Sequence, residues 1–553
     1  MLTQTIKRHG EDLTRRRGDR SANYDRPVPV SPRLRVFFLA LFTGIILTTA
    51  CGSKPIDPRT VIPGDALVYL ESSDLGRTLA AITDNPKFEA AAKFKPDFGA
   101  LSGIKISIAV TGFETSEQAV TEENAVLNFQ PRFVAVVETN AWGWQTTGFI
   151  ENQLGEFVNE AYGGDVQLDI SLRNDGKYFV WTSPDGRKAY ALQQDSLVFF
   201  GNDETALERC QAVKRGEAES IAKNPKITND DRIAFGYISP QGIGQIANIA
   251  GVSLAMRASE EDEVKSFVAG VLPEILRNSV KDMTWTASTT EKGIEDRVVI
   301  TLDDESARVG DETLAPSPAG ESQLTDLVPA SAASSTRYLL RDPQIAWRSV
   351  VLTARKKTDE TSGALIAAFS ASLFEAYGIE DPELFLSAVG SQIMTVKLAA
   401  DSEDAAVIAS IKDSANARRA IAKEINLTRP PEKQFGGDFW KSDDGELAAA
   451  LIADRMIVGD AETVLKCLEA KQAGGNAALA QQLALSDAVA TTVVNETDSI
   501  GRLIDVLSER KNENERIPMQ YRTETRFNNN GIERRTVSDF GLIGSIIEQL
   551  AQE

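Results

Sequence analysis

An internal repeat constrains the fold of this 553-residue chain more than any other feature. The stretch Trp181–Asp195 matches Trp440–Asp454 at eight positions with a constant offset of 259 residues. Shorter matches keep the same order: Ile62-Pro63 with Val328-Pro329, Glu204–Leu207 with Glu462–Leu465, and Gly293–Glu295 with Gly531–Glu533. The offsets fall steadily from 266 to 238, as they should if the second copy has lost loop residues. Since chance rarely gives a colinear series, the sequence predicts a tandem duplication whose two copies fold alike.

Within each copy, short strands alternate with helices. The first copy opens with the alternating strand Ala66–Glu71, and Asp74 can then cap a helix. A later pair of apolar strands is joined by Ser183–Gly186, a tight-turn sequence. Tight turns join antiparallel strands, whereas parallel strands need long crossovers. The pattern therefore favours an α+β fold, with mixed or antiparallel sheets and packed helices, over a doubly wound parallel sheet.

The repeat also sets the expected domain boundaries. The first repeat domain covers residues 62–302 and the second covers residues 327–553. Residues 303–326 between them are acidic, contain Pro, Ser and Gly, and lack apolar periodicity, which predicts a linker. The second copy ends in an amphipathic helix, Phe540–Leu550, expected to dock on its own domain or else to grip a partner or a membrane. The very apolar helix Gly363–Tyr377 is expected to be buried.

A short apolar run near the N-terminus predicts where the chain resides. Arg33 and Arg35 precede the uncharged residues 36–50, which are rich in Phe, Leu and Ile. A membrane-spanning helix needs about 20 apolar residues, so this run is at or below the lower limit. A basic flank, a short apolar core and an exit of small residues are typical of a secretory signal.

The exit of that run, Leu47-Thr48-Thr49-Ala50-Cys51, resembles the lipobox of bacterial lipoproteins, in which small residues precede a lipidated cysteine. Thr48 departs from the usual pattern, which has leucine at that place. The resemblance implies that residues 1–50 are a signal peptide, that Cys51 is the lipidation site and that residues 51–61 form a tether. There are two alternatives: an uncleaved membrane helix over about residues 36–51, and a buried cytoplasmic helix.

The lipoprotein signal and the uncleaved membrane helix both place the bulk of the chain outside the cytoplasm, because positively charged flanks stay inside. We expect an exported protein, in the periplasm or at the outer membrane, whose lipid anchor makes the membrane its partner. No Asp follows Cys51, and the resemblance to lipoproteins of bacteria with two membranes then implies the outer membrane over the inner one. The exported chain also resembles uncharacterised bacterial lipoproteins built from a repeated α/β domain, which implies no specific activity.

Charge and histidine usage exclude several functions. After residue 50 the chain holds 50 basic and 76 acidic residues, a net charge of −26 that repels phosphate backbones, so we expect no nucleic-acid partner. The only histidine is His9, in the leader. Its absence from the exported part excludes Ser-His-Asp and Cys-His catalysis and histidine-ligated zinc, copper and haem. Carboxylate chemistry, a Ser-Lys dyad and oxygen-ligated calcium stay open.

Four local motifs are better explained by structure than by chemistry. Ser-x-x-Lys occurs at Ser102–Lys105 and Ser220–Lys223, as often as composition alone predicts. The pairs Asp185-Gly186 and Asp444-Gly445 lack the ligand spacing of a calcium loop. Both Asp-Gly pairs instead predict hairpin turns.

Two further pairs of residues also have plain interpretations. Gly201 and Gly459 each lie between a strand and a helix, as in phosphate loops, but acidic residues follow them and predict helix caps. Trp142 and Trp144 could stack on a sugar. With one residue between them they would point to opposite faces of an extended segment, so we expect at least one of the two in the core.

Cys210 and Cys467 lie in predicted helices on the sides that face a core. We expect buried free thiols, with a disulfide between the repeats as the alternative in an oxidising compartment.

These observations predict no catalytic residue, no cofactor and no metal site; Cys51 is the one assigned site. The favoured function is a lipid-anchored cell-envelope protein, without enzymatic activity, that binds another protein or an envelope polymer. The alternatives are an envelope hydrolase using carboxylate or Ser-Lys chemistry, and a small-ligand-binding protein with a pocket between the repeats.

Overall fold

The structure is a computed structural model that describes residues 55–119, 125–228, 230–257, 263–317, 324–399, 402, 404–484, 486–508 and 516–550. The leader and Cys51 lie outside these ranges, so their predicted roles stay predictions. Among the described residues, no helix combines the length and hydropathy that crossing a bilayer requires.

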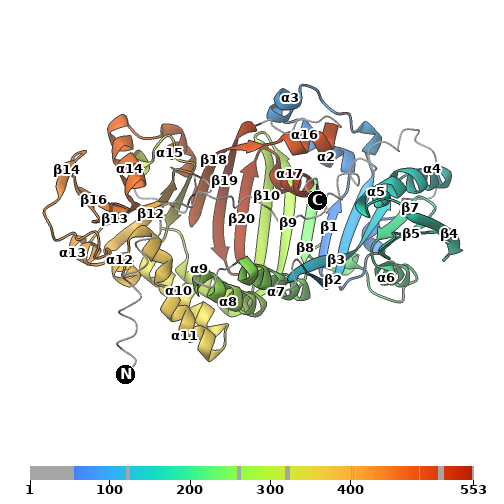
Figure 1. The fold of residues 1–553 in the computed structure, drawn as a ribbon, viewed down its shortest axis with the longest axis horizontal. Helices are drawn as coiled ribbons and strands as arrows, with labels where there is room; N and C mark the ends of the chain where they lie inside the picture. The colour runs from blue at the N-terminus through green and yellow to red at the C-terminus, as the bar shows by residue number, and fades with distance from the viewer. Residues whose placement is uncertain are drawn as a thin grey trace.

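The fold is α+β, and its described strands form one antiparallel sheet of twenty (Figure 1). The first half of the sheet follows the order β4 (Gln167–Arg173), β5 (Gly176–Thr182), β6 (Lys188–Gln194), β7 (Leu197–Gly201), β3 (Ala125–Glu138), β2 (Lys105–Ala119), β1 (Val68–Ser72), β8 (Ala234–Ile238), β9 (Val280–Thr290) and β10 (Gly293–Leu302). The second half continues with β20 (Gly531–Ser538), β19 (Arg516–Asn528), β18 (Ala490–Ser499), β11 (Ser334–Leu339), β12 (Val389–Lys397), β13 (Ala406–Ile411), β17 (Arg455–Asp460), β16 (Leu447–Ile452), β15 (Gly437–Lys441) and β14 (Glu432–Gln434).

The strand order of the first half recurs in the second half. Each strand of the first half has a counterpart ten strands later, so that β1 corresponds to β11 and β10 to β20. The two halves meet where β10 pairs with β20, over eight registered positions from Ile294↔Ser538 to Thr301↔Gly531. The halves therefore share one sheet, and β4 and β14 form its two ends. This correspondence is what the predicted duplication would produce.

Side chains alternate between the two faces of the sheet, and each face has its own core. In β7, Val198 and Phe200 pack in one core while Leu197 and Phe199 pack in the other. We name the first the α2 face and the second the α6 face, after helices that cover them. Helices that share cores on the α2 face are α2 (Leu75–Thr83), α3 (Pro86–Ala92), α4 (Gly143–Phe149), α5 (Gly155–Ala161), α12 (Pro382–Ala388), α13 (Ser414–Arg419), α16 (Gly501–Ser508) and α17 (Gly541–Leu550), with the short helices η4 (Gly99–Leu101), η5 (Ile150–Leu154) and η8 (Ser372–Tyr377).

The α6 face is covered by a second, smaller set of helices. They are η3 (Pro58–Thr60), α6 (Glu204–Lys214), η6 (Ile221–Lys223), η7 (Leu324–Leu327), α14 (Ala461–Ala473) and α15 (Ala477–Ala484). A further group runs along one border of the sheet, the lower one in Figure 1: α7 (Pro240–Arg257), α8 (Glu263–Ser279), α9 (Asp304–Thr313), α10 (Pro343–Lys356) and α11 (Glu360–Phe369). The first half thus carries helical cover on both faces around β1, where the candidate site lies.

Two elements differ from expectation at the boundary between the halves. The segment 303–326, predicted as a linker, contains helix α9, which packs on β19 and β20 of the second half. Asp303 caps that helix by accepting hydrogen bonds from the backbone N–H groups of Glu305 and Ser306. The C-terminal helix α17 crosses in the other direction: it packs against α16 of its own half and against β9 and β10 of the first half. The helix therefore docks on its own domain, as expected, and it also packs on the first half.

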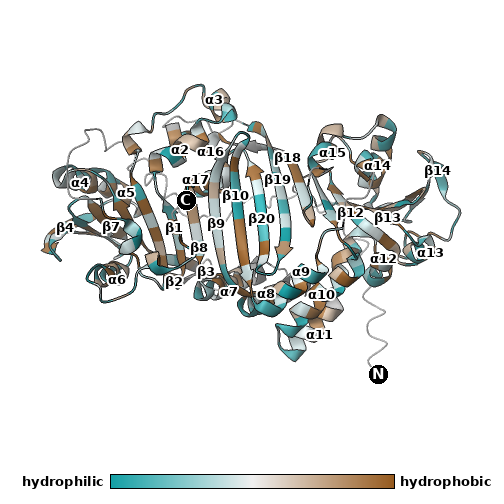
Figure 2. Ribbon diagram, turned by 180° about the vertical axis from the view of Figure 1, so that it is seen from behind, coloured by the Kyte–Doolittle hydropathy of each residue, from teal (hydrophilic) through white to brown (hydrophobic). Residues whose placement is uncertain are grey.

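The apolar stretch Gly363–Tyr377 is also placed differently from the prediction. It forms the end of α11 and the short helix η8, and Leu365 and Leu373 are 41% and 55% exposed. In Figure 2, α10 and α11 carry apolar and polar segments side by side and project from the border of the sheet. Ile366 and Gly363 are buried, so only one side of this stretch packs on the protein.

Candidate functional site

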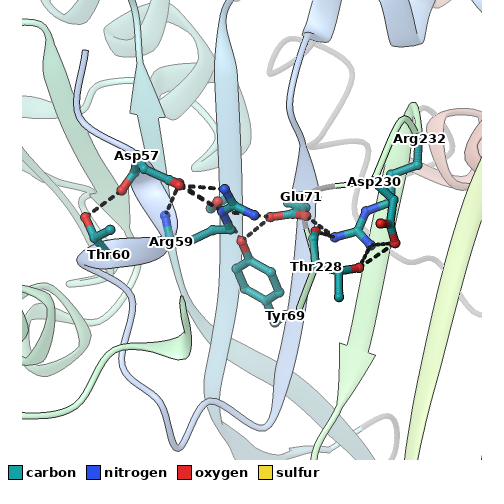
Figure 3. A network of polar contacts seen from close by, with 9 residues as sticks. Asp57, Arg59, Thr60, Tyr69, Glu71, Thr228, Asp230 and Arg232 are labelled. Atoms are coloured by element: carbon teal, nitrogen blue, oxygen red, sulfur yellow. Dashed lines mark hydrogen bonds and ion pairs between the residues drawn. The ribbon is translucent and has the colours of Figure 1, made fainter. Parts of the chain in front are cut away.

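A polar network on the α6 face joins the first described residues of the chain to the sheet. It surrounds a small cavity of about 120 Å³ between η3, β1, β2 and the loop before β8. Figure 3 shows the side chains of this network. The charged and hydroxyl residues around the cavity are Asp57, Arg59, Glu71, Ser72, Ser73, Lys105, Ser107, Thr228, Asp230 and Arg232.

Local structure explains how the side chains converge. Tyr69 and Glu71 are two residues apart on β1, so both point to the α6 face. The strand register sets Glu71 opposite Ser107 of β2 and opposite Phe235 of β8. On the N-terminal side, Asp57 caps the 3-10 turn of η3, and Pro58 at its first position favours that turn because its φ is already fixed. The turn also brings the side chain of Arg59 to the carboxylate of Asp57.

Glu71 is the centre of the network (Figure 3). Its Oε1 accepts a hydrogen bond from Arg232 Nη2 at 2.6 Å, and its Oε2 accepts one from the Tyr69 hydroxyl at 2.6 Å. Arg59 Nε lies 3.9 Å from Oε2. Arg232 is only 6% exposed and its guanidinium stacks on Phe235, 3.8 Å from the ring centroid. A buried ion pair of this kind specifies one geometry, because either partner alone would be an uncompensated buried charge.

The pKa values of three groups in the network, Asp57, Arg59 and Tyr69, are shifted by burial and by their partners. Burial, the charge of Glu71 and the hydrogen bond to it raise the pKa of Tyr69 far above its usual value, so the hydroxyl stays a donor. Burial alone would raise the pKa of Asp57, but hydrogen bonds from the side chain and backbone of Arg59 outweigh it and lower the pKa. The hydrogen bond to Asp57 in turn raises the pKa of Arg59. None of these groups is poised to exchange a proton near neutral pH.

The network is balanced in charge. Three carboxylates, of Asp57, Glu71 and Asp230, face the three cations Arg59, Lys105 and Arg232. Such a cavity offers no net charge to attract an ion, and its volume suits water or a very small polar molecule. The arrangement has a structural role, because it holds η3 and the loop before β8 against β1.

The fastened segment lies where the tether was expected. Ile56 N donates to Glu138 Oε2 at 3.1 Å, and Glu138 is fully buried. Pro58, Val61 and Ile62 are also buried. The part of the 51–61 tether that the structure describes is therefore packed on the sheet from residue 56 onward and does not hang free.

The two Ser-x-x-Lys motifs are not assembled as dyads. Lys223 Nζ forms an ion pair with Glu219 at 3.1 Å, and Ser220 begins the short helix η6. Lys105 lines the polar cavity, whereas Ser102 ends η4 and is not among the residues around that cavity. A second, more open cavity of about 640 Å³ lies between residues 63–65 and residues 209–225. Both cavities are lined by first-half residues, so neither provides the pocket between repeats that the ligand-binding alternative predicted.

The two Asp-Gly motifs form matching hairpin turns, as predicted. Ser183 Oγ donates to Asp185 in the first half, and Ser442 Oγ donates to Asp444 at 2.5 Å in the second. The hydrogen bond from Ser183 lowers the pKa of Asp185 to about 2. The glycine that follows each aspartate has a positive φ, 86° and 81°, which only glycine adopts readily.

The residues after Gly201 and Gly459 cap helices, also as predicted. Asp203 accepts a hydrogen bond from Thr205 N at the start of α6, and Asp460 accepts one from Thr463 N at the start of α14. The tryptophan expectation was wrong. Trp142 and Trp144 are 46% and 74% exposed, because the chain enters α4 at Gly143 and the first helical turn directs both rings outward.

Both candidate thiols are buried and unpaired, as the helical pattern predicted. Cys210 lies in α6 and Cys467 in α14. Burial raises the pKa of each thiol to about 12. Neither can act as a thiolate nucleophile at neutral pH. Among the described residues, no group of three or more potential ligands is arranged to hold a metal ion.

Neither the polar network nor the exposed apolar side chains of strand β4 are predicted from the sequence. No motif marks the network, because its members, among them residues 57, 71, 107, 228, 230 and 232, are far apart in sequence and meet only in the folded chain. A signal did exist for β4: Leu168, Ile170 and Leu172 alternate with polar residues, but alternation alone does not tell which face is covered.

No protein-family model matches the chain, and no curated protein matches it. Two solved structures of the protein TP0453 are similar to part of it. Crystal form III is 10% identical, covers 48% of this chain and 90% of its own, and has a TM-score of 0.23. Crystal form I is 10% identical, covers 46% and 81%, and has a TM-score of 0.20. These scores are too low to support a conclusion about function.

Proposed function

We propose that the protein is a lipid-anchored, non-enzymatic interaction protein of the cell envelope, exported through residues 1–50 and attached at Cys51. The observation that carries the proposal is the docking of residues 56–62 on the sheet, directly after the predicted anchor. An anchor on Cys51 followed by a packed segment would hold the folded part close to the membrane.

The reach of the anchor can be bounded. Ile56 is five residue steps after Cys51, and an extended chain spans at most about 3.5 Å per step, so the anchor would be within about 18 Å of the docked segment. The border of the α6 face around η3 would then lie near the bilayer surface. The far end of the sheet, at β14, would be presented to the surroundings. This geometry suits a scaffold that displays surfaces to other envelope components.

A binding role is favoured over hydrolysis because the polar network has its carboxylates and its tyrosine already engaged. General acid-base catalysis needs a group that can give and take a proton near the working pH. The pKa shifts of Tyr69, Asp57 and Arg59 all stabilise the protonation state that each group already has. Envelope proteins or polymers are the partners that this location offers.

Crosslinking in intact cells, followed by mass spectrometry of the membrane fraction, tests the proposal, with Cys51→Ser as the variant. We expect a specific crosslinked partner that the variant loses, together with release of the variant from membranes. Cys210→Ala is the matched control, since it removes a thiol that is buried and far in sequence from the anchor, and it should keep both the partner and the membrane attachment. A Cys51→Ser chain that stays in the membrane with the same partner would overturn the anchoring, and substrate turnover lost on mutating a carboxylate pair would overturn the non-enzymatic role.

A further inference from the structure

Strand β4 leaves an apolar stripe exposed at the first-half end of the sheet. Leu168, Ile170 and Leu172 are 40%, 46% and 85% exposed, and their alternation puts all three on one face of the strand. The register sets Leu168 opposite Trp181 and Ile170 opposite Phe179, two residues of the α2-face core. The stripe therefore continues that core outward, past the point where helices cover it. Among the described strands, β4 pairs with β5 alone, so its other edge is unpaired.

The opposite end of the sheet shows that the fold does not need this stripe. Strand β14 occupies the corresponding place in the second half, yet it has only three residues, Glu432, Lys433 and Gln434. Lys433 forms an ion pair with Asp438, and Gln434 donates to Glu432. A short, charged end strand is the usual protection against edge-to-edge pairing. The long apolar edge at β4 lacks that protection.

We propose that β4 pairs antiparallel with β4 of a second copy of this chain, in the register centred on Ile170. This inference is independent of the proposed function. In that register all seven residues of the strand are used. Leu168 lies opposite Leu172 of the second copy, and Ile170 lies opposite Ile170. On the other face, Asp169 lies opposite Ser171 and Gln167 lies opposite Arg173, so no like charges face each other directly.

The centre of the same sheet shows that this kind of pairing suits the fold. There β10 and β20, which hold corresponding places in the two halves, pair antiparallel over eight positions. Pairing of β4 with β4 would extend the sheet in the same way across a two-fold axis. Because the other end, β14, is short and charged, the assembly would close at two copies and would not grow into a filament.

The chain's net charge of −21 opposes the approach of two copies. Salt screens this repulsion and leaves the apolar contact intact, so association should strengthen as salt rises. A pairing held by ion pairs would weaken instead. One strand pair is a small interface, so the dimer is weak in dilute solution, and covalent trapping is the suitable measurement.

Disulfide trapping in the cell fraction that holds the full chain tests the proposal. Ile170→Cys places the new thiol opposite itself, where strand neighbours lie about 5 Å apart and a disulfide can form. Leu172→Cys is the matched control: it lies on the same face of the same strand and is more exposed, but in this register its own counterpart is four residues away. The parent chain sets the background from its native cysteines, and Lys433→Cys tests the other end of the sheet.

Three results are expected together after mild oxidation. Ile170→Cys gives a band of twice the chain mass, Leu172→Cys alone and Lys433→Cys remain at background, and a co-expressed mixture of Leu168→Cys and Leu172→Cys gives the dimer. The yield from Ile170→Cys increases when salt is raised. The proposal is overturned if Ile170→Cys remains a monomer, if it links to a species of another mass, or if Leu172→Cys alone links as efficiently.

Discussion

Arg297 of β10 lies directly opposite Arg535 of β20 at the centre of the twenty-stranded sheet. The two residues are 238 apart, the same offset that separates Gly293–Glu295 from its match Gly531–Glu533. Two ion pairs cross this position, Arg297 with Glu533 at 2.9 Å and Arg535 with Glu295 at 2.8 Å, and they too are related by that offset. The strand pairing that joins the two halves is thus centred on one pair of corresponding residues, and the two carboxylates offset the repulsion between its two cations.

The two crossed ion pairs should stabilise the folded protein mainly by offsetting the repulsion between Arg297 and Arg535. Replacing Glu295 and Glu533 together by Gln leaves Arg297 and Arg535 facing each other, and we expect the free energy of unfolding to fall by about 1–2 kcal/mol, more at low salt. Urea denaturation at two salt concentrations measures this. The control, Glu151→Gln with Glu156→Gln, removes the same charge from an exposed helix. A loss no larger than the control's would contradict the prediction.

The buried pair of Arg232 and Glu71 should contribute much more than exposed pairs. Arg232→Met leaves Glu71 buried without its closest cation, and we expect a loss of about 3–5 kcal/mol in the free energy of unfolding. Arg77→Met is the control nearby, because its ion pair with Asp231 is exposed and its loss should cost far less. Equal losses in the two variants would show that burial does not set the cost.

Asp296 should make the docking of α17 sensitive to pH. Its carboxylate is 5% exposed and accepts hydrogen bonds from Trp285 Nε1 and Leu542 N, both at 2.7 Å. Burial raises the pKa of Asp296 in spite of these bonds. The folded state therefore holds this proton to a higher pH than the unfolded state. Its contribution to stability is complete below the unfolded pKa, about 3.9, and declines as pH rises through the folded pKa.

Asp296→Asn removes this ionisation but keeps an acceptor for one of the two donors. We expect the stability of the variant, relative to the parent, to improve as pH is raised from 4 to 7. Asp296→Ala should lose about 1–3 kcal/mol at every pH, since Trp285 and Leu542 then lack an acceptor. Unfolding curves across that pH range give both comparisons, and an Asn variant that loses ground as pH rises would show that the carboxylate is ionised and stabilising.

Thiol counting should separate the two buried cysteines from Cys51. Cys210 and Cys467 are buried with pKa values near 12, so the native protein should not react at these positions with a maleimide at pH 7. In denaturant the anchored protein should expose two thiols, because the Cys51 sulfur is taken by the lipid. Three reactive thiols would mean an unmodified Cys51, and none would mean a disulfide between Cys210 and Cys467.

The duplication made the repeated strand order predictable. The hairpin turns at Ser183–Gly186 and Ser442–Gly445 were predictable because turn residues act locally. It was not predictable that the two halves share one sheet. The pairing of β10 with β20 requires that both strands have an unpaired edge, and no local sequence pattern shows this. Helix α9 was missed because its buried side consists of Ser306, Ala307 and Gly310, small residues that leave no apolar period. The opposite error occurred at Gly363–Tyr377, where apolar composition predicted burial and Leu373 is exposed. The polar network combines residues distant in sequence, and neither charge nor spacing indicates that they meet.

The mass of the mature N-terminal peptide tests the central claim most directly. The protein is purified from the membrane fraction with its native sequence, digested, and its first peptide is measured by mass spectrometry. The account predicts a peptide that begins at Cys51 and carries the added mass of acyl chains. A peptide that extends to residues before Cys51, or an unmodified Cys51, would contradict it and would favour an uncleaved helix over residues 36–51.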